Sequence, residues 1–443
     1  MFVVGLMLHF HLAAYAYLES AFTGSLAIYL WTRPGVRSLA GTLLLSAAFG
    51  AIYGVVYSAP WVGAYPAFLG LGSLGSLGLA ALWCGPSQRQ SSLDTCLTAS
   101  LFPLFLILSG FSLAVTSVAH PKTYDLFLYA FDEQLGGQPS FLAGQLFARF
   151  GVLRQMCNLG YEALPLAMAV AFALERSRPR GHLPSIMPAF AVAAAGGFLL
   201  YNLYPAVGPV HVFGAQFPYS PPAAGLPPFR MVAVGDAPRN AMPSVHIAMA
   251  LLILWNSRPW PGVWRVLAGA LLAITALATL GFGEHYLVDL LVAVPFALLA
   301  QGLAASGVPW RNTRRIACVG TGALAVLAWL TYLRLPSPPL AGRGALVWSL
   351  LLGSAAASII LESRLQRAVA QAGVAALGRV NEACLTVLGK PLPDGRGSVR
   401  VSLVPQGLPS RDRQEAVSVN RNPQNGKALV NEGEYTGPPR APG

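Results

Sequence analysis

The sequence predicts an all-α protein, a polytopic membrane helix bundle with about eleven transmembrane helices. Hydrophobic residues make up 55% of the chain and charged residues only 10%, whereas a soluble domain carries about 25% charged residues. The mean hydropathy is +0.56. The apolar residues also gather in runs of about 20 residues, the length that crosses the hydrocarbon core of a bilayer as a helix.

Eleven apolar runs are candidate spans. They lie at residues 3–31, 39–58, 65–83, 95–118, 156–174, 185–204, 243–257, 263–281, 285–303, 316–333 and 344–361. The first run has no basic segment before it and no clear cleavage site, so we expect a retained helix and not a signal peptide. The short seventh run ends among the tryptophans Trp255, Trp260 and Trp264, a residue type enriched where helices leave the membrane.

The net charge of +12 is carried almost entirely by arginine. The arginines sit in alternate loops between the apolar runs, at Arg33 and Arg37, Arg89, Arg176, Arg178 and Arg180, Arg258 and Arg265, and Arg311, Arg314 and Arg315. Basic loops face the cytoplasm, so this pattern orients the helices in the membrane and argues against nucleic-acid binding. We expect the membrane to be a bacterial-type inner or plasma membrane. The N-terminus is then outside and the C-terminus inside.

Two further segments are not predicted to span the membrane. Residues 119–152 mix acidic and basic residues with Phe, Tyr and Leu, which predicts amphipathic helices at the outer interface. The tail from about residue 385 is rich in Pro, Gly, Asn and charged residues, which predicts disorder in the cytoplasm.

Most of the cysteines and histidines carry no predicted chemistry. The five cysteines, Cys84, Cys96, Cys157, Cys318 and Cys384, show no paired spacing, which argues against a disulfide framework and against a zinc site. Four histidines are interpreted as amphipathic residues at the membrane–water interface, namely His9, His11, His120 and His182.

The informative residues lie in two short motifs. The loop at residues 205–242 faces outward in this topology and leads into Pro243-Ser244-Val245-His246. A second element, Gly283-Glu284-His285-Tyr286-Leu287-Val288-Asp289, opens the ninth run. Because one helical hairpin separates them, we expect His246 and His285 to meet at the same membrane face.

The residue types of the second motif suit phosphate chemistry. His285 and Asp289 are four apart, so on a helix they would share a face. The carboxylate of Asp289 can then hold one imidazole nitrogen while the other acts as a nucleophile. The start of a helix also offers N–H groups to an anion. An ionisable group at membrane depth is costly, so Asp289 needs such a partner.

The first motif supplies complementary groups. Pro243 and Ser244 predict another helix start, with Pro in the first turn and Ser as the cap. The hydroxyl of Ser244 and the N–H groups of this turn can hold phosphate oxygens. His246 can protonate a leaving oxygen. Arg239 can bind phosphate as a charged fork, and Asn240 completes the phosphate-binding set that we expect.

Together the two motifs resemble the second and third signatures of the type 2 phosphatidic acid phosphatase superfamily. The strings RNAMPSVHIA and GEHYLVDLL resemble its inositol phosphorylceramide synthase-like branch of inositolphosphotransferases. The resemblance implies that His285 forms a phosphohistidine, that Asp289 orients it, and that His246 protonates the leaving group.

The resemblance also implies a catalytic core of six helices, formed by the fourth to ninth runs. The chain then divides into membrane helices at 1–92, the core at 93–303, two further membrane helices at 304–362, and the cytoplasmic tail at 363–443.

The chain departs from the superfamily pattern in its basic residues. Val245 stands where the second motif has Gly, and Thr279 stands where the third motif has Arg. The first motif is reduced to the segment from Tyr204 to Pro209, and Val210 follows where related sequences often have Arg. Arg239 and Arg230 are the candidate replacements.

Two functions are compatible with these motifs. The first is a lipid phosphatase or phosphotransferase, an enzyme that needs neither a metal nor a cofactor because a phosphoenzyme and bound arginine can handle the charge. Its partners would be a lipid phosphate and membrane lipids. The motifs leave open whether water or a sugar or inositol hydroxyl accepts the phosphoryl group, and Glu284 could contact such a hydroxyl. The alternative is a non-catalytic lipid transporter or scaffold that keeps the fold.

Overall fold

The computed structural model describes residues 15–57, 65–83, 85–176, 186–222, 229–305, 307–335 and 342–389, together with 420–421 and 428–429. Residues 3–14 of the first predicted span, His9, His11, His182, Arg178, Arg180 and most of the predicted tail lie outside this part of the chain. The chain forms two compact units, one of residues 1–178 and 182–373 and one of residues 179–181 and 374–443.

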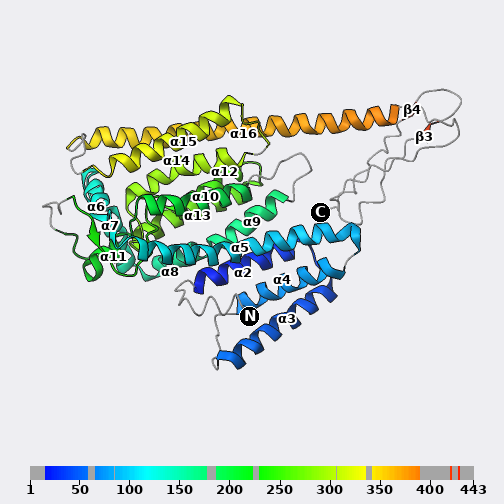
Figure 1. The fold of residues 1–443 in the computed structure, drawn as a ribbon, viewed down its shortest axis with the longest axis horizontal. Helices are drawn as coiled ribbons and strands as arrows, with labels where there is room; N and C mark the ends of the chain where they lie inside the picture. Colours follow the sequence, from blue (N-terminus) through cyan, green and yellow to red (C-terminus); the bar gives the residue numbers. More distant parts are fainter. Residues whose placement is uncertain are drawn as a thin grey trace, which may run out of the picture. The chain divides into compact units, whose positions relative to one another are not determined.

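The first unit is an all-α bundle, as predicted (Figure 1). Its helices are α2 (Tyr15–Trp31), α3 (Val36–Tyr57), α4 (Tyr65–Trp83), α5 (Pro86–Ala119), α6 (Asp125–Gln134), α7 (Pro139–Arg149), α8 (Gly151–Glu162), α9 (Leu164–Arg176), α10 (Ile186–Leu203), α11 (Pro209–Phe213), the 3-10 turn η2 (Gly214–Gln216), α12 (Val245–Asn256), α13 (Gly262–Gly281), α14 (Leu287–Ala304), α15 (Thr313–Tyr332) and α16 (Gly344–Gly389). Within the described residues, eight helices are long and apolar enough to cross a membrane.

The remaining predicted spans are shorter or broken. The fifth run forms two helices, α8 and α9, which are bent by 51° and would make a ninth span if taken together. α8 carries Arg154, Asn158 and Glu162, and Pro165 stands near the start of α9. The polar residues of α8 favour a less apolar environment than that of α9. Pro165 favours a break between the two helices, because Pro is tolerated in the first turn of a new helix. α12 is a short apolar helix of 12 residues.

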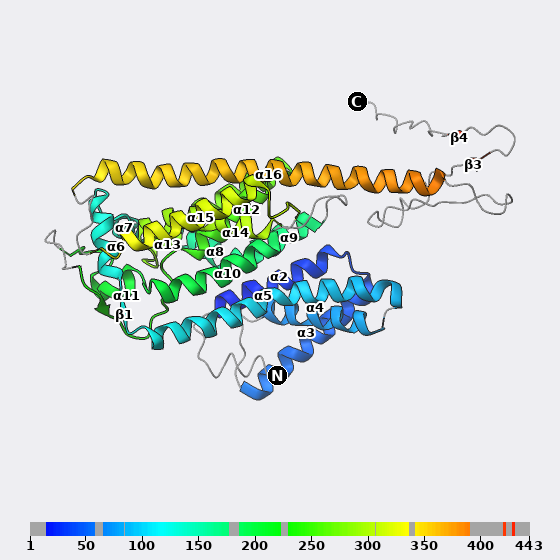
Figure 2. The same cartoon turned by 45° about the horizontal axis from the view of Figure 1, so that its top comes forward.

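α14 is the central helix of the bundle. Of its apolar window, 72% is buried, the largest share among the candidate spans. It packs against α10, α12 and α15, and these helices lie side by side in both ribbon views (Figures 1 and 2). α10 approaches α12 closely because Gly197 has no side chain where it faces Val245. α2, α3, α4 and α5 form a further group.

The end of α14 is closed by a buried arginine. Arg315, at the start of α15, is 4% exposed. Its guanidinium donates to the backbone carbonyls of Gly302, Leu303 and Val308 at 3.0, 2.9 and 2.6 Å. The last carbonyls of a helix lack partners within the helix, so Arg315 satisfies them.

α6 and α7 lie together at one end of the bundle (Figures 1 and 2). We expected amphipathic helices at an interface, and for α6 this prediction is wrong, because every residue from Asp125 to Asp132 is buried. Aromatic contacts hold α6 in place, including Phe131 against Trp329 at 6.2 Å between ring centroids. β1 (Lys122–Thr123), just before α6, pairs antiparallel with β2 (Val232–Ala233).

The two buried acids of α6 accept backbone N–H groups from other segments. Asp132 receives those of Leu287 and Val288, at 2.7 and 3.2 Å, at the start of α14. Asp125 receives those of Val207 and Gly208, at 3.1 and 2.8 Å. Burial raises the pKa of both carboxyl groups, although these hydrogen bonds oppose the shift. α6 thereby positions two loops that reach the candidate site.

α16 is longer than its predicted span. It continues from residue 361 to Gly389, which includes the first part of the segment predicted as a tail. This stretch has no proline before Pro391 and is rich in Ala, Leu and Arg, which favour helix. The second unit is described only in the end of α16 and in an antiparallel pair of short strands, β3 (Asn420–Arg421) and β4 (Ala428–Leu429).

Replacing the α6 acid that caps α14 should destabilise the bundle. In Asp132→Ala, the N–H groups of Leu287 and Val288 lose their acceptors, and a lost helix cap costs about 1–2 kcal/mol. We expect a thermal unfolding midpoint in detergent several degrees lower than that of the wild type. Asp94→Ala is the matched control, because Asp94 is exposed and its carboxylate accepts from Gln90 on the same helix. Equal midpoints for the two variants would contradict the capping role.

Candidate active site

Three chain segments that are distant in sequence meet at the N-terminal ends of α12 and α14. Val210 N–H donates to Gly283 O at 3.0 Å, and Ala241 N–H donates to Ala206 O at 3.0 Å. The remnant of the first motif therefore lies against both histidine motifs, as the resemblance implies for a shared site.

Gly208 makes this close approach possible. Its φ is +94°, a backbone conformation that side chains disfavour. A Cβ at this position would also collide with the carbonyl of Glu284. The loop before α11 can therefore pack directly on the segment that carries His285.

Ser244 is the N-cap of α12, as predicted. Its backbone is extended, and its Oγ accepts the N–H of Ile247 at 3.4 Å. Ser244 N–H in turn donates to the carbonyl of Asp289 at 3.3 Å, which joins the two motifs. Pro243 precedes the cap, so the prediction that it lies in the first turn is wrong.

His285 is buried, with 1% of its surface exposed. Its Nδ1 lies 2.8 Å from the carbonyl oxygen of Ala241. A carbonyl only accepts, so Nδ1 carries the proton in this contact. Nε2 lies 3.1 Å from Ser244 Oγ, and in the neutral ring it accepts the proton of that hydroxyl. Ser140 of α7 also donates to the backbone carbonyl of His285 at 2.8 Å, so both the ring and the backbone of His285 are held by hydrogen bonds.

Asp289 lies beside His285, but the two do not share a helix face. α14 begins at Leu287 and its N-cap is Tyr286, so the expectation that both residues are helical is wrong. The helix begins late because Asp289 Oδ2 accepts the N–H of Tyr286 at 2.7 Å. The same oxygen lies 3.6 Å from Nδ1 of His285. Asp289 thus faces the protonated nitrogen at the distance of an ion pair.

The start of α14 is not open to an anion, contrary to our expectation. The first N–H groups already donate to Asp132, and the N–H of Asp289 donates to Tyr286 O at 3.2 Å. The sequence signal for this contact was Asp132 itself, an acid in an otherwise apolar stretch.

His246 faces the same site from the first turn of α12. Its ring is stacked on Tyr161 of α8, with centroids 4.4 Å apart and an interplanar angle of 22°. Tyr161 OH lies 3.4 Å from His246 Nδ1. The rings of His246 and His285 are 6.3 Å apart between centroids. Sequence reasoning missed Tyr161, which no motif marks.

Arg239 is engaged with backbone in this structure. It is 1% exposed, and its guanidinium donates to the carbonyls of His120, Val234, Gly235 and Ala237. Arg230 is exposed. Thr279, which stands at the Arg position of the third motif, is buried and its carbonyl accepts the N–H groups of Glu284 and His285 at 3.1 and 3.2 Å. The side chain of Arg239 and the backbone carbonyl of Thr279 therefore hold the loops of the site.

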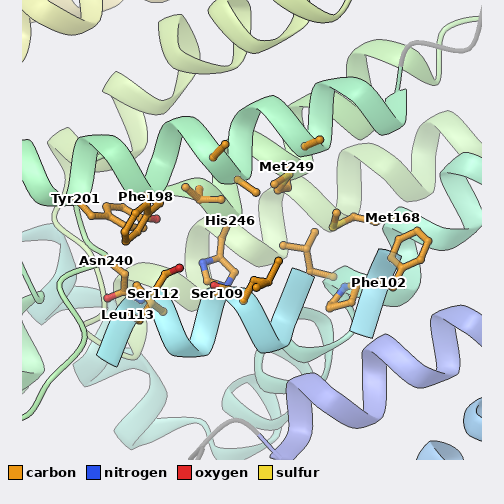
Figure 3. A pocket seen from close by; sticks show the side chains of 17 residues that line it. Phe102, Ser109, Ser112, Leu113, Met168, Phe198, Tyr201, Asn240, His246 and Met249 are labelled. Carbon is orange, nitrogen blue, oxygen red and sulfur yellow. The ribbon is translucent and has the colours of Figure 1, made fainter. Parts of the chain in front are cut away.

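A cavity of about 330 Å³ opens beside His246 (Figure 3). α5, α9, α10 and α12 supply its walls, and Asn240 contributes from the loop before α12. Asn240 Oδ1 is buried and makes no hydrogen bond to any residue that the structure describes. Asn240 is therefore the predicted phosphate-binding residue that lines the cavity, and its amide NH2 is the group that could donate to a phosphoryl oxygen.

His211 and Glu284 form a pair at the surface next to the site. His211 Nε2 lies 3.6 Å from Glu284 Oε2, and both side chains are about one third exposed, 31% and 27%. The hydrogen bond that His211 donates to the carboxylate of Glu284 raises the pKa of His211, against the opposing effect of partial burial. Sequence reasoning assigned no role to His211. The pair places a titratable cation two residues after Pro209, near the position where the first motif has Arg.

The fold and these contacts define a class of protein, a membrane-type helix bundle that brings two histidines together where three chain segments meet. Residues 126–303 match the family model of the PAP2 superfamily. This segment runs from α6 nearly to the end of α14 and contains all six predicted site residues. The match supports the superfamily and does not extend to the inositol phosphorylceramide synthase-like branch. No curated protein and no solved structure matches the chain.

Removing the carboxylate of Glu284 should lower the pKa of His211. Because the folded pKa is raised above its ordinary value of 6.5, the stabilisation from the pair is complete below that pH and is lost as the pH rises through the folded pKa. In Glu284→Gln, we expect the pKa to return toward the ordinary value, measured by NMR titration of isotope-labelled histidines in detergent. His211→Gln assigns the signal, and Glu133→Gln is a control acid. An unchanged titration in Glu284→Gln would show that the pair does not form.

Proposed function

We propose that this protein is an integral membrane enzyme that removes or transfers the phosphoryl group of a lipid phosphate through a phosphohistidine on His285. The observation that carries the proposal is the state of His285. Its Nδ1 is fixed as a donor to Ala241 O, so the neutral ring keeps the lone pair on Nε2. An imidazole with one nitrogen fixed and the other available as a base is suited to nucleophilic attack.

In the first step, Nε2 of His285 attacks phosphorus and the bond from phosphorus to the lipid oxygen breaks. His246 gives a proton to the leaving oxygen, which departs as an alcohol. Asp289, 3.6 Å from Nδ1, stabilises the positive charge that develops on the ring. Ser244 Oγ, 3.1 Å from Nε2, turns its hydroxyl from Nε2 to a phosphoryl oxygen when phosphate arrives.

In the second step, an acceptor oxygen attacks phosphorus and the phosphorus–nitrogen bond breaks, which regenerates Nε2. His246, now neutral, takes the proton of the acceptor. If the acceptor is water, the product is inorganic phosphate. If it is a sugar or inositol hydroxyl, the product is a new phosphate ester, which is the reaction that the branch resemblance implies.

Phosphate binding in this proposal relies on Ser244, Asn240 and Arg239. Arg239 holds the loop that carries Asn240 through its four carbonyl contacts. Direct contact between Arg239 and phosphate requires that the guanidinium exchange one carbonyl for a phosphoryl oxygen. A charged fork of this kind binds phosphate strongly when it is available.

We also propose that the site faces the non-cytoplasmic side. His246 stands at the start of α12, and Arg258 follows the opposite end of the same helix. The arginines Arg311, Arg314 and Arg315 likewise stand between the end of α14 and the body of α15. Basic residues mark the cytoplasmic ends of membrane helices, which supports an N-terminus outside and a C-terminus inside.

One observation favours the alternative of a non-catalytic lipid transporter or scaffold. The arginine expected to bind phosphate is occupied by backbone carbonyls and almost fully buried. A site that has lost its phosphate-binding charge could keep the fold without the reaction.

Purified protein in detergent would separate these functions. We would assay phosphatidic acid, an isoprenyl diphosphate and phosphatidylinositol, each with and without an added sugar or inositol, and follow both free phosphate and new phosphate esters. We expect His285→Ala to lower kcat by at least about a thousandfold, because it removes the nucleophile, and His246→Ala to lower it by about 10²–10⁴, the range for general acid catalysis.

His120→Ala is the matched control. Its ring bonds only to Asn202 among the contacts that the structure gives it, at 3.1 Å, so turnover should stay close to that of the wild type. Free phosphate would indicate a hydrolase, and a phosphate ester of the added sugar or inositol would indicate a transferase. Equal turnover in the wild type and His285→Ala, or no turnover with any substrate, would favour the non-catalytic alternative.

A further inference from the structure

The cavity beside His246 has a polar end and an apolar end. Its polar groups lie near His246, with Asn240 and Ser112 on one side of the imidazole in the close view (Figure 3). Phe102 and Met168 lie at the opposite end. A ligand that matches this arrangement has a polar head at the histidine and an apolar chain directed away from it.

The length of the cavity corresponds to one leaflet of a bilayer. Along α5 its lining extends from Phe102 to Leu113, and along α10 from Ala191 to Tyr201. At a rise of about 1.5 Å per residue, these stretches are about 15–17 Å long. Half of a hydrocarbon core of about 30 Å has the same length.

The width of the cavity suits one chain. Its volume of about 330 Å³ is at the lower limit of ligand pockets, which span about 300–1,000 Å³. Small side chains on α10 create this space, namely Ala191, Ala194 and Ala195. Two of the lining residues stand on the outside of the bundle, because Leu108 of α5 is 52% exposed and Ala195 of α10 is exposed. A chain can therefore enter sideways, between α5 and α10, from the surrounding lipid.

We propose that this cavity holds one hydrocarbon chain of the lipid phosphate, and that Phe102 and Met168 at its apolar end set the longest chain that fits. The inference rests on the proposed function, because it assigns the chain to a substrate whose phosphate lies at His246 and His285. A chain that reaches the end fills the cavity and holds the phosphate in place. A longer chain must displace side chains, which a packed interior resists.

The test uses butyl, dodecyl and octadecyl phosphate as substrates in detergent. In Ala194→Phe, the new ring occupies the middle of the cavity. We expect kcat/KM to fall at least about tenfold for the two long substrates, the scale on which pockets discriminate by size, and to stay within about twofold for butyl phosphate. Met168→Ala lengthens the cavity and should raise the ratio of octadecyl to dodecyl turnover.

Ala114→Phe is the matched control for Ala194→Phe. Ala114 lies on α5 next to a lining residue, but it is exposed and outside the cavity, so its variant should show no selectivity between chain lengths. If Ala194→Phe affects all three substrates equally or none of them, the chain-binding role is wrong while the phosphatase activity stands.

A binding measurement keeps the inference testable without turnover. Dodecyl phosphate should raise the thermal unfolding midpoint of His285→Ala protein. Adding Ala194→Phe to this variant should abolish the shift, whereas adding Ala114→Phe should leave the shift unchanged. If dodecyl phosphate binds in this way but the wild type turns over no substrate, the proposed reaction fails and the cavity assignment holds. If no shift occurs in His285→Ala protein, the cavity does not bind the chain.

Discussion

The structure depends on how the two ends of α14 are fixed. A helix leaves its first N–H groups and its last carbonyls without partners, and such groups are costly when buried. In this chain one carboxyl group from α6 accepts the N–H groups at the start, and one guanidinium from α15 donates to the carbonyls at the end. Because α10, α12 and α15 all pack on α14, these two residues position most of the bundle.

The chemistry of the site follows from the start of this helix. Since α14 begins at Leu287, His285 lies before the helix and its ring can turn toward Ala241 and Ser244. Asp289 serves two groups with one oxygen, the N–H of Tyr286 and the ring of His285. The helix cap and the orientation of the imidazole are therefore coupled, so a change that moves the helix start also moves the histidine.

The features that depend on residues close together in the chain could be predicted from the sequence. Apolar runs predicted the helices, and the motif pair correctly brought His246 and His285 together across one hairpin. The capping of the first N–H groups of α14 by Asp132 could not be predicted, because Asp132 lies far upstream in the chain. The guanidinium of Arg239 donates hydrogen bonds to the backbone carbonyl of His120 and to carbonyls of its own loop. No spacing of residues in the sequence indicates these contacts. The stacking of Tyr161 on His246 and the cavity beside them arise from packing between helices, which one sequence does not specify.

The position of α5 in the chain has a consequence for how such a protein can diverge. The segment that matches the superfamily begins at residue 126, and α5 ends before it, at Ala119. The histidines and their supports thus belong to one stretch of the gene, while a wall of the adjoining cavity belongs to another. Substitutions in the upstream stretch can therefore change this wall without changing the two histidines, so the chemistry proposed for them is open to adaptation for different membranes.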